Sequence, residues 1–418
     1  MKRIMQFLLL GVSLIPAGHG IAADLRNATL TITQPNPAQV EISWLSRSAV
    51  PAPGLQLLPE YQLEKSSDFT NWLAQGTPVT GFHGQTLRVT NTMPESAGFY
   101  RVKSIVRRPF GHFNQVNFSN GELARADFFG AEFFAANLTA ANLSAADLRG
   151  TDLRFADLTD VVALGADFFA ADLLFATAEF ALLEDADLRF ANLEAADFFA
   201  GSLQGSDLRG SILTGADLNF VTLHQSLIDA QTLLEPKWVR VWQLIHGQAT
   251  NTSFANLDFS FADMRITDLH DMNFAGADFS STLLGEADLR GANFTGANLR
   301  FVDFTDALLD PSTIIEPKSR LVWEILTIGA VGRDLHGTNL GSTFLAFSNM
   351  QGVNLTNANL SLAILFRTDL QNADLRNANF SSANLSQANL LGALTNGTIF
   401  GGATFSQTIM PDGSIRNF

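Results

Sequence analysis

The sequence contains no cysteine, so disulfide bonds are excluded. Proline is nearly absent from the later part of the chain, because after Pro109 it occurs only at positions 236, 311, 317 and 411. Proline removes a donor from a sheet ladder, so its absence favours long, uninterrupted β structure. After the first residues, no stretch reaches 18 consecutive apolar residues, which excludes a membrane-spanning helix of ordinary length.

Basic residues are few. The chain of 418 residues has 26 Lys and Arg against 41 Asp and Glu, a net charge of −15. Residues 1–112 hold 10 basic and 6 acidic residues, and residues 113–418 hold the remaining 16 and 35. The acidity therefore belongs to the part of the chain after residue 112.

That part is dominated by an apolar residue at every fifth position. The register runs without interruption from Phe113 to Leu233, which is about 25 repeats. Two residues before each apolar centre the chain usually has Ala, and Asp or Asn often stands between them. Residues two apart in extended chain point the same way, so the centre and the Ala face inward and the Asp or Asn faces outward. The last two residues of each repeat must turn a corner, which predicts a β-solenoid rising by about 4.8 Å per coil.

These repeats resemble the pentapeptide-repeat family, whose pattern is A-(D/N)-L-x-x. The pattern is met at Ala146-Asp147-Leu148-Arg149-Gly150 and at Ala297-Asn298-Leu299-Arg300-Phe301. The resemblance implies an all-β fold, a right-handed, four-sided β-helix with about four repeats per coil. It covers nearly everything after residue 112 and says little about function.

Two interruptions divide the repeats, at 234–253 and 315–334. Each opens with Glu-Pro-Lys, and proline is typical of a first helical turn, so we expect two short helices at about 236–246 and 317–328. The interval from Leu233 to Phe254 equals that from Ile314 to Leu335 and exceeds four repeats of five by one. This predicts insertions of one coil plus one residue. The repeat blocks are then 113–233, 254–314 and 335–410, followed by a C-terminal tail, 411–418.

Tryptophans stand in both predicted helices. Trp238 and Trp242 are four residues apart, on one helix face, and Trp323 matches Trp242 in the second interruption. We expect them to anchor the helices on the solenoid; the alternative is a platform for a ligand.

The N-terminus has a different organisation. Residues 1–23 begin with Lys2 and Arg3, continue with an apolar run and end in small residues, the pattern of a secretory signal peptide. The alternative is a buried N-terminal helix. We therefore expect an exported protein that is periplasmic, on the cell surface or extracellular.

Residues 24–106 alternate between apolar and polar positions and predict a small β-sandwich, joined by a linker at 107–112. The segments Tyr61-Gln62-Leu63-Glu64, Asn71-Trp72 and Gly98 to Val102 resemble immunoglobulin- or fibronectin-like modules of secreted bacterial proteins.

Candidate chemistry is sparse. Aspartates recur at every fourth repeat, at 127, 147, 167, 187 and 207, with Arg149, Arg189 and Arg209 two positions after three of them. This column reads as a solvated ladder; a calcium site is the alternative, but calcium needs 6–8 oxygens from flexible loops. The seven histidines have no metal-ligand spacing. We predict no catalytic residue, no cofactor and no metal site.

Phenylalanine at outward positions is the more informative anomaly. Six such residues fall on two adjacent faces if four repeats make a coil: Phe129, Phe134, Phe155, Phe169, Phe175 and Phe190. Clustered exposed aromatics mark interfaces, so these six are the candidate interface, for a protein partner or for self-association. The favoured function is a non-enzymatic, exported scaffold with an acidic rod surface that binds protein and no nucleic acid. The alternative is an acidic mimic of DNA that inhibits a DNA-binding enzyme.

Overall fold

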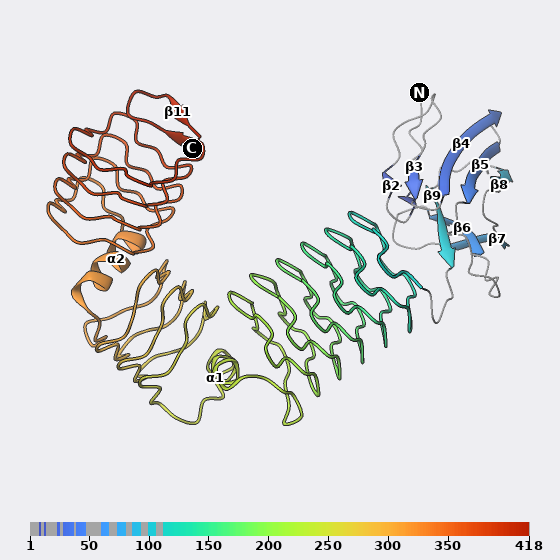
Figure 1. Cartoon of the computed structure of the whole chain (residues 1–418), viewed down its shortest axis with the longest axis horizontal. Coiled ribbons are helices and arrows are strands. Elements are labelled where there is room, and N and C mark those ends of the chain that lie inside the picture. Colours follow the sequence, from blue (N-terminus) through green and yellow to red (C-terminus); the bar gives the residue numbers. More distant parts are fainter. Residues whose placement is uncertain are drawn as a thin grey trace. The chain divides into compact units, whose positions relative to one another are not determined.

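The computed structural model describes residues 112–417 in full and, before them, only the backbone of nine strands (Figure 1). These strands form antiparallel sheets in the orders β3-β4-β5-β8 and β7-β6-β9, with β1 and β2 paired to each other. Their bounds are β1 Leu8–Leu9, β2 Val12–Ser13, β3 Ala23–Leu25, β4 Ala28–Asn36, β5 Gln39–Ser46, β6 Glu60–Ser66, β7 Leu73–Thr80, β8 Thr86–Thr92 and β9 Phe99–Ile105. The predictions of a signal peptide, of sandwich packing and of a linker concern features that lie outside the described residues.

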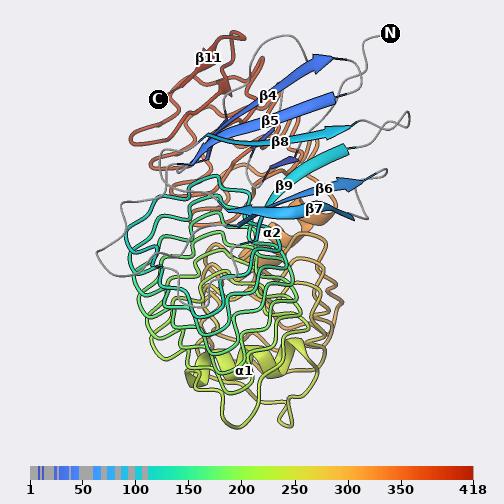
Figure 2. The same cartoon turned by 90° about the vertical axis from the view of Figure 1, so that its right-hand side faces the viewer.

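The repeats of the rest of the chain form a β-solenoid in which most outward residues pair with the equivalent residue four repeats later. The bridges are parallel, as between Asp147 and Asp167, so four five-residue repeats make one coil. Leu148 donates its N–H to the carbonyl of Asp167 in the next coil (2.7 Å), and the N–H of Asp147 bonds the carbonyl of Ala126 in the previous one (2.8 Å). Figure 1 shows the coils of the first block edge-on, and Figure 2 shows them obliquely as a stack of near-parallel loops.

The coils belong to two compact units. One comprises Met1–Asp217 with Gln225–Leu234, and the other Leu218–His224 with Glu235–Phe418. The first unit holds nearly all of the first repeat block, and the second holds the other two blocks and both helices.

Most repeats end in the same hydrogen-bonded turn. In the repeat around Leu153, the N–H of Ala156 bonds the Leu153 carbonyl (3.0 Å), and Phe155, the third residue of the turn, has a φ of 58°. The outward Asp152 closes the turn, because its Oδ1 accepts the N–H of Arg154 (3.2 Å). Short side chains that bond the backbone two residues on are typical of turns, and this explains why Asp and Asn recur at the outward position.

The inward residues form a continuous core. Leu148 and Ala146 are almost fully buried, as the five-residue period predicts. Phenylalanines replace leucine in long stacks, and the rings of Phe254, Phe274 and Phe294 follow one another at 5.8 and 5.4 Å between centres. A buried tyrosine would need a hydrogen-bond partner for its hydroxyl, which accounts for the preference for Phe over Tyr in such stacks.

Helices occupy both interruptions of the repeat. They are α1, Pro236–Ile245, and α2, Pro317–Thr327, and each begins with proline after a Glu N-cap. Trp238 and Trp242 are buried, and Trp323 donates its ring N–H to the carbonyl of Ala307 (2.7 Å). Trp323 therefore anchors α2 on the repeats, as predicted.

The register of five predicts that Leu233 and Ile314 face inward, and this prediction was wrong at the end of the first block and at the end of the second. Leu233 pairs with Ile212 and Ile314 pairs with Asn293, each one position beyond the regular ladder spacing, and both side chains point outward and are more than half exposed. The cause is a longer turn before each helix. In the first, Asp229 Oδ1 accepts the N–H groups of Gln231 (2.9 Å) and Thr232 (3.0 Å), which takes one extra residue. The additional residue thus lies in the turn and not in the helical insertion.

The second long turn has the same construction. Asp310 Oδ1 accepts the hydroxyl of Ser312 (2.6 Å) and the N–H of Thr313 (3.0 Å). The hydrogen bonds from the Ser312 hydroxyl and from the backbone N–H groups of Gly291 and Thr313 lower the pKa of Asp310 to about 2.

The C-terminal residues fold back as a hairpin of β10, Thr408–Ile409, and β11, Ile415–Arg416. The guanidinium of Arg416 lies 4.0 Å from the centre of the Phe405 ring, so the predicted tail covers part of the last coil. Within the part of the chain that the structure describes, no helix has the length and apolarity that a membrane crossing requires.

Candidate interaction surface

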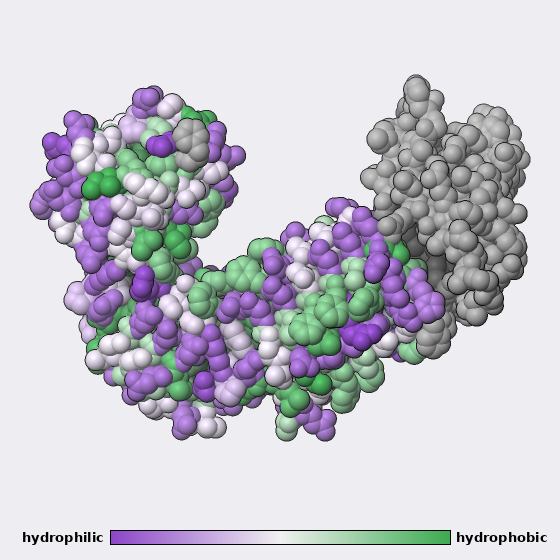
Figure 3. Space-filling model, in the orientation of Figure 1, coloured by the Kyte–Doolittle hydropathy of each residue, from purple (hydrophilic) through white to green (hydrophobic). Residues whose placement is uncertain are grey.

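The six predicted interface phenylalanines lie in two neighbouring columns of turns in the first unit. The first turn column holds Phe129, Phe169 and Phe190, and the second holds Phe134, Phe155 and Phe175. We call these six residues the aromatic corner. Phe129, Phe155, Phe175 and Phe190 are between 42% and 53% exposed, and the other two are half-buried. On the side of these coils seen in Figure 3, hydrophobic side chains are interleaved with hydrophilic ones.

Half of the aromatic corner stands in strained backbone. Phe155, Phe175 and Phe190 have φ values of 57–58°, in the left-handed region. A bulky side chain is a real outlier there, and an L-residue pays about 1–2 kcal/mol for this conformation. The repeat pattern predicts that these residues lie at corners, but it does not indicate that their φ is positive.

The rings of the aromatic corner stack along the coils. Phe155 lies 5.3 Å from Phe175 with an interplanar angle of 22°, and Phe134 meets the edge of Phe155 at 5.5 Å. In the first turn column, Phe169 and Phe190 are 5.5 Å apart. Phe190 also covers Gly210, where an added Cβ would lie 2.6 Å from its ring. Stacking thus hides part of these five rings and leaves the rest in solvent.

Arginines complete the corner. The guanidinium of Arg149 lies 5.2 Å from the Phe129 ring centre, and that of Arg154 lies 5.7 Å from Phe134. Arg154 also clamps Asp152 with two hydrogen bonds, of 2.8 and 2.7 Å. These bonds lower the pKa of Asp152 below its usual value. The corner is therefore a mixed surface of rings, guanidinium groups and neutralised carboxylates.

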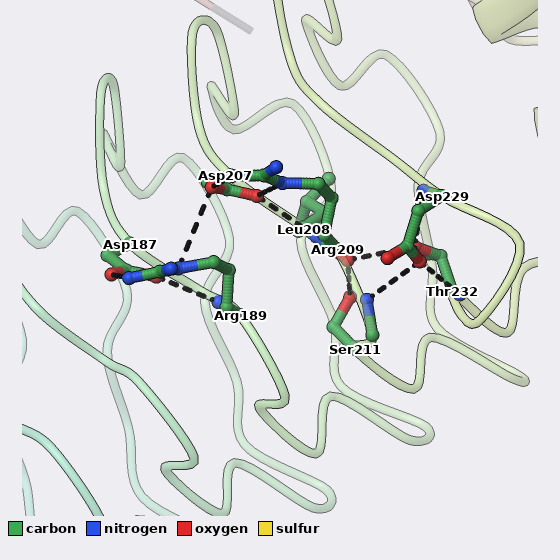
Figure 4. Close-up of polar contacts among 9 residues, drawn as sticks. Asp187, Arg189, Asp207, Leu208, Arg209, Ser211, Asp229 and Thr232 are labelled. Carbon is green, nitrogen blue, oxygen red and sulfur yellow. Dashed lines mark hydrogen bonds and ion pairs between the residues drawn. The ribbon is translucent and has the colours of Figure 1, made fainter.

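The predicted aspartate column is present on the adjacent face, where Asp127, Asp147, Asp167, Asp187 and Asp207 pair in sequence. Figure 4 shows its last two rungs: Arg189 Nη2 lies 2.6 Å from Asp187 Oδ2, and its Nε lies 3.6 Å from Asp207 Oδ2. Arg209 clamps Asp207 in the same way (2.6 Å). Neighbouring carboxylates at about 4.8 Å repel by roughly 1 kcal/mol in water, and the arginines offset this repulsion.

The end of the first block is fixed by one carboxylate. Asp229 Oδ1 accepts the N–H of Gly210 (3.0 Å) in the previous coil, and Thr232 donates its hydroxyl to the carbonyl of Leu208 (3.0 Å) (Figure 4). Ser211 bonds the same carbonyl (2.6 Å). This cluster supplies partners for backbone groups where the regular ladder ends.

A buried charge in the second unit was not predicted. The side chain of Asp263 is fully buried, lies 2.6 Å from Arg265 Nη2 and accepts the hydroxyl of Thr222 (2.8 Å). Burial alone would raise the pKa of Asp263, but the hydrogen bonds from Arg265 and Thr222 lower it. The sequence offered only the Asp-x-Arg spacing as a signal. The arrangement links Thr222 to Asp263 within the second unit and is structural.

The histidines are dispersed in the structure too. Nδ1 of His112 lies 2.7 Å from Glu132, Nδ1 of His270 lies 2.5 Å from Asp268, and the ring of His246 stacks on Trp242. The hydrogen bond to Asp268 raises the pKa of His270. Among residues 112–417, no three His, Asp or Glu side chains are grouped so that they could hold a metal ion. His19 and His83 lie outside the described residues.

Comparison with known proteins agrees with this architecture. A family model described as "Pentapeptide repeats (8 copies)" matches residues 136–173, 191–227, 273–310, 334–365 and 363–402. No curated protein matches the chain. Solved structures do: HetL, a pentapeptide repeat protein involved in heterocyst differentiation regulation from the cyanobacterium Nostoc sp. strain PCC 7120, is 24% identical. The match covers 73% of this chain and 93% of HetL, with a TM-score of 0.16.

Two further solved structures are similar. Rfr23, a pentapeptide repeat protein from the cyanobacterium Cyanothece 51142, is 22% identical over 30% of this chain and 92% of its own, with a TM-score of 0.18. QnrB1, a plasmid-mediated fluoroquinolone resistance protein, is 13% identical over 71% of this chain and 90% of its own, with a TM-score of 0.14. At these TM-scores the similarities say nothing about what this chain binds. The family match and the ladder of four-repeat coils together show that this protein carries pentapeptide repeats in all three repeat blocks and folds through them into a β-solenoid.

Proposed function

We propose that this chain is an exported, non-enzymatic scaffold that binds protein through the aromatic corner. In this proposal, the coils form a right-handed, four-sided rod with an acidic surface, and the N-terminal strands form a small sandwich. The basic, apolar and small residues of segment 1–23 support the export.

One observation carries the binding role: the same phenylalanines are both exposed and strained. Full burial of a Phe side chain is worth about 1.5–3 kcal/mol, and Phe155, Phe175 and Phe190 forgo about half of it while they hold a left-handed backbone. The fold does not require this, because Gly150 and Gly210 fill the position of Phe190 in neighbouring coils. The left-handed φ recurs at this turn position throughout the solenoid, so the distinctive feature of the corner is that exposed phenylalanines cluster there in two neighbouring turn columns.

The corner fits a protein better than a nucleic acid. Its rings stack on one another and on arginines, and the carboxylate of Asp152 is neutralised by Arg154. A mimic of DNA would instead need rows of free carboxylates. On the adjacent face, Asp147, Asp187 and Asp207 are each clamped by the arginine two residues later. These ion pairs favour the scaffold over the DNA mimic.

The binding role can be tested by photo-crosslinking in the source cells. A benzoylphenylalanine at position 175 should give a discrete adduct, which mass spectrometry then identifies. The matched control is position 164, because Leu164 is also exposed (41%) but its turn column contains no aromatic residue. Adducts of equal yield at both positions, or at neither, would refute the proposal.

Export is tested separately by cell fractionation. The chain should appear outside the cytoplasm and begin after Ala22 or Ala23 by N-terminal sequencing. A full-length chain confined to the cytoplasm would overturn export and favour the DNA mimic.

A further inference from the structure

We propose that the partner of the aromatic corner is a second copy of this chain, paired antiparallel about a two-fold axis through the coil of Phe169 and Phe175. This inference rests on the proposed binding role and adds the identity of the partner. It comes from the order of side chains along the two turn columns.

Antiparallel pairing about such an axis has a simple geometry. If the axis lies in the contact plane and is perpendicular to the coils' stacking direction, each column faces the same column of the other copy. The order of the coils is reversed. A residue one coil before Phe175 then faces a residue one coil after it, and Phe175 faces Phe175 of the second copy.

The sequence along each column is self-complementary under this reversal. In the second turn column, Phe155 faces Ala195 of the second copy, so a large side chain meets a small one. In the first turn column, Phe190 faces Gly150, which has nothing within 4 Å of an added Cβ. Since the operation is symmetric, each of these contacts occurs twice.

The charged side chains are also complementary when the order of the coils is reversed. Arg154 would face Glu194 of the second copy, again twice. Glu194 is exposed, and among the described residues it has no ion-pair partner. The side chain of Arg154 is 42% exposed although it clamps Asp152. The unpaired carboxylate and the accessible guanidinium thus stand one coil either side of the proposed axis.

Like charges that the axis brings together are already compensated within each copy. Arg149 would face Arg189, but each is clamped by an aspartate at 2.6 Å. Asp172 would lie beside the axis, where Asn192 donates to its Oδ1 (3.0 Å) and Arg154 lies 3.7 Å away.

The contact would be modest in size. Five coils at about 4.8 Å give a strip about 24 Å long, which belongs to the small, reversible class of interfaces. Sedimentation equilibrium of the full chain should therefore show a monomer at low concentration and a dimer at high concentration. A monomer throughout, up to the highest soluble concentration, would overturn the proposal.

Single cysteines test the geometry cleanly, because the chain has no other. With a short bismaleimide, Phe175→Cys should crosslink to itself. Phe155→Cys alone should not, but it should crosslink in a mixture with the Ala195→Cys chain. Leu164→Cys is the matched control and should remain monomeric. If folded Phe175→Cys, judged by circular dichroism, gives no more dimer than Leu164→Cys, the axis is wrong.

The charge pair provides a rescue test. Glu194→Arg places two arginines opposite each other and should weaken the dimer about tenfold or more. Adding Arg154→Glu swaps the charges and should restore association, although it removes the clamp on Asp152. A double variant as weak as Glu194→Arg alone would contradict the pairing. An adduct at position 175 with a different protein in cells would overturn self-pairing and leave the scaffold role standing; the absence of any adduct would overturn both.

Discussion

Replacement of Gly210 by alanine should separate backbone strain from side-chain collision in this solenoid. Gly210 has a φ of 71°, and an added Cβ would lie 2.6 Å from the ring of Phe190. Gly150 occupies the same turn column with a φ of 63° and has nothing within 4 Å of the added carbon. Gly150→Ala is therefore a matched control that introduces strain alone.

The two costs can be worked from the structure. Gly150→Ala should lower the free energy of unfolding by about 1–2 kcal/mol, the cost of a left-handed L-residue. Gly210→Ala should cost about 1 kcal/mol more, because the Phe190 ring must move and loses its contact with Phe169 at 5.5 Å, a type of contact worth about 0.5–1.5 kcal/mol. In the background of Phe190→Ala the collision disappears, so Gly210→Ala should then cost no more than Gly150→Ala.

The assay is a double-mutant cycle in urea unfolding. Repeat proteins can unfold locally, so hydrogen exchange at residues 186–215 should accompany it. Equal costs for the two glycine variants, or no coupling between positions 190 and 210, would show that the ring does not rest on Gly210.

Three other outcomes follow from the structure. Asp263→Ala should lower the free energy of unfolding in urea by about 2 kcal/mol, less than a fully buried pair would cost, because Arg265 is 49% exposed. Phe274→Ala opens the core and should cost about 3–5 kcal/mol, whereas Phe347→Ala, at a side chain 63% exposed, should change stability by under about 1 kcal/mol. Asp310 has a pKa of about 2 in the folded state, below its value in the unfolded state. Its contribution to the free energy of unfolding is therefore complete above about pH 4 and is lost as the pH falls toward 2. Melting temperatures from pH 5 to 2 should fall less steeply for Asp310→Asn; an unchanged slope would contradict this.

The fold could be predicted from the sequence because one rule is repeated many times. An apolar residue at every fifth position has only one regular way to point inward, and Leu148 and Phe274 obey it. The rule failed at Leu233 and Ile314, where the residue is apolar but turned outward. The determinant there is Asp229 or Asp310, whose side chain closes a turn one residue longer than the others. Aspartate is so frequent in the repeats that it gave no warning.

The candidate surface was only half predictable. Counting four repeats per coil placed Phe155 and Phe175 in one column, and they do stack. Composition alone could not show that both residues hold a positive φ, since residues other than glycine rarely adopt that conformation. Nor could it identify Asp263 as buried, because aspartates elsewhere in the repeats stay at the surface. Both features depend on how neighbouring coils cover one another.

The long turns and helices have a consequence for the length of the molecule. The same arrangement occurs twice, at a constant offset along the chain. It consists of a long turn closed by Asp229 or Asp310, followed by α1 or α2, and a ladder hydrogen bond, from Phe220 to Phe261 (2.7 Å) or from Phe301 to Ser342 (3.1 Å). Removing residues 236–316 would join Glu235 to Pro317 and keep the Glu-Pro-Lys start of the helix. Inserting a second copy of that segment would likewise leave every coil in register. Residues 236–316 thus form a natural unit of extension, and the number of coils can be lowered or raised by whole copies of this unit.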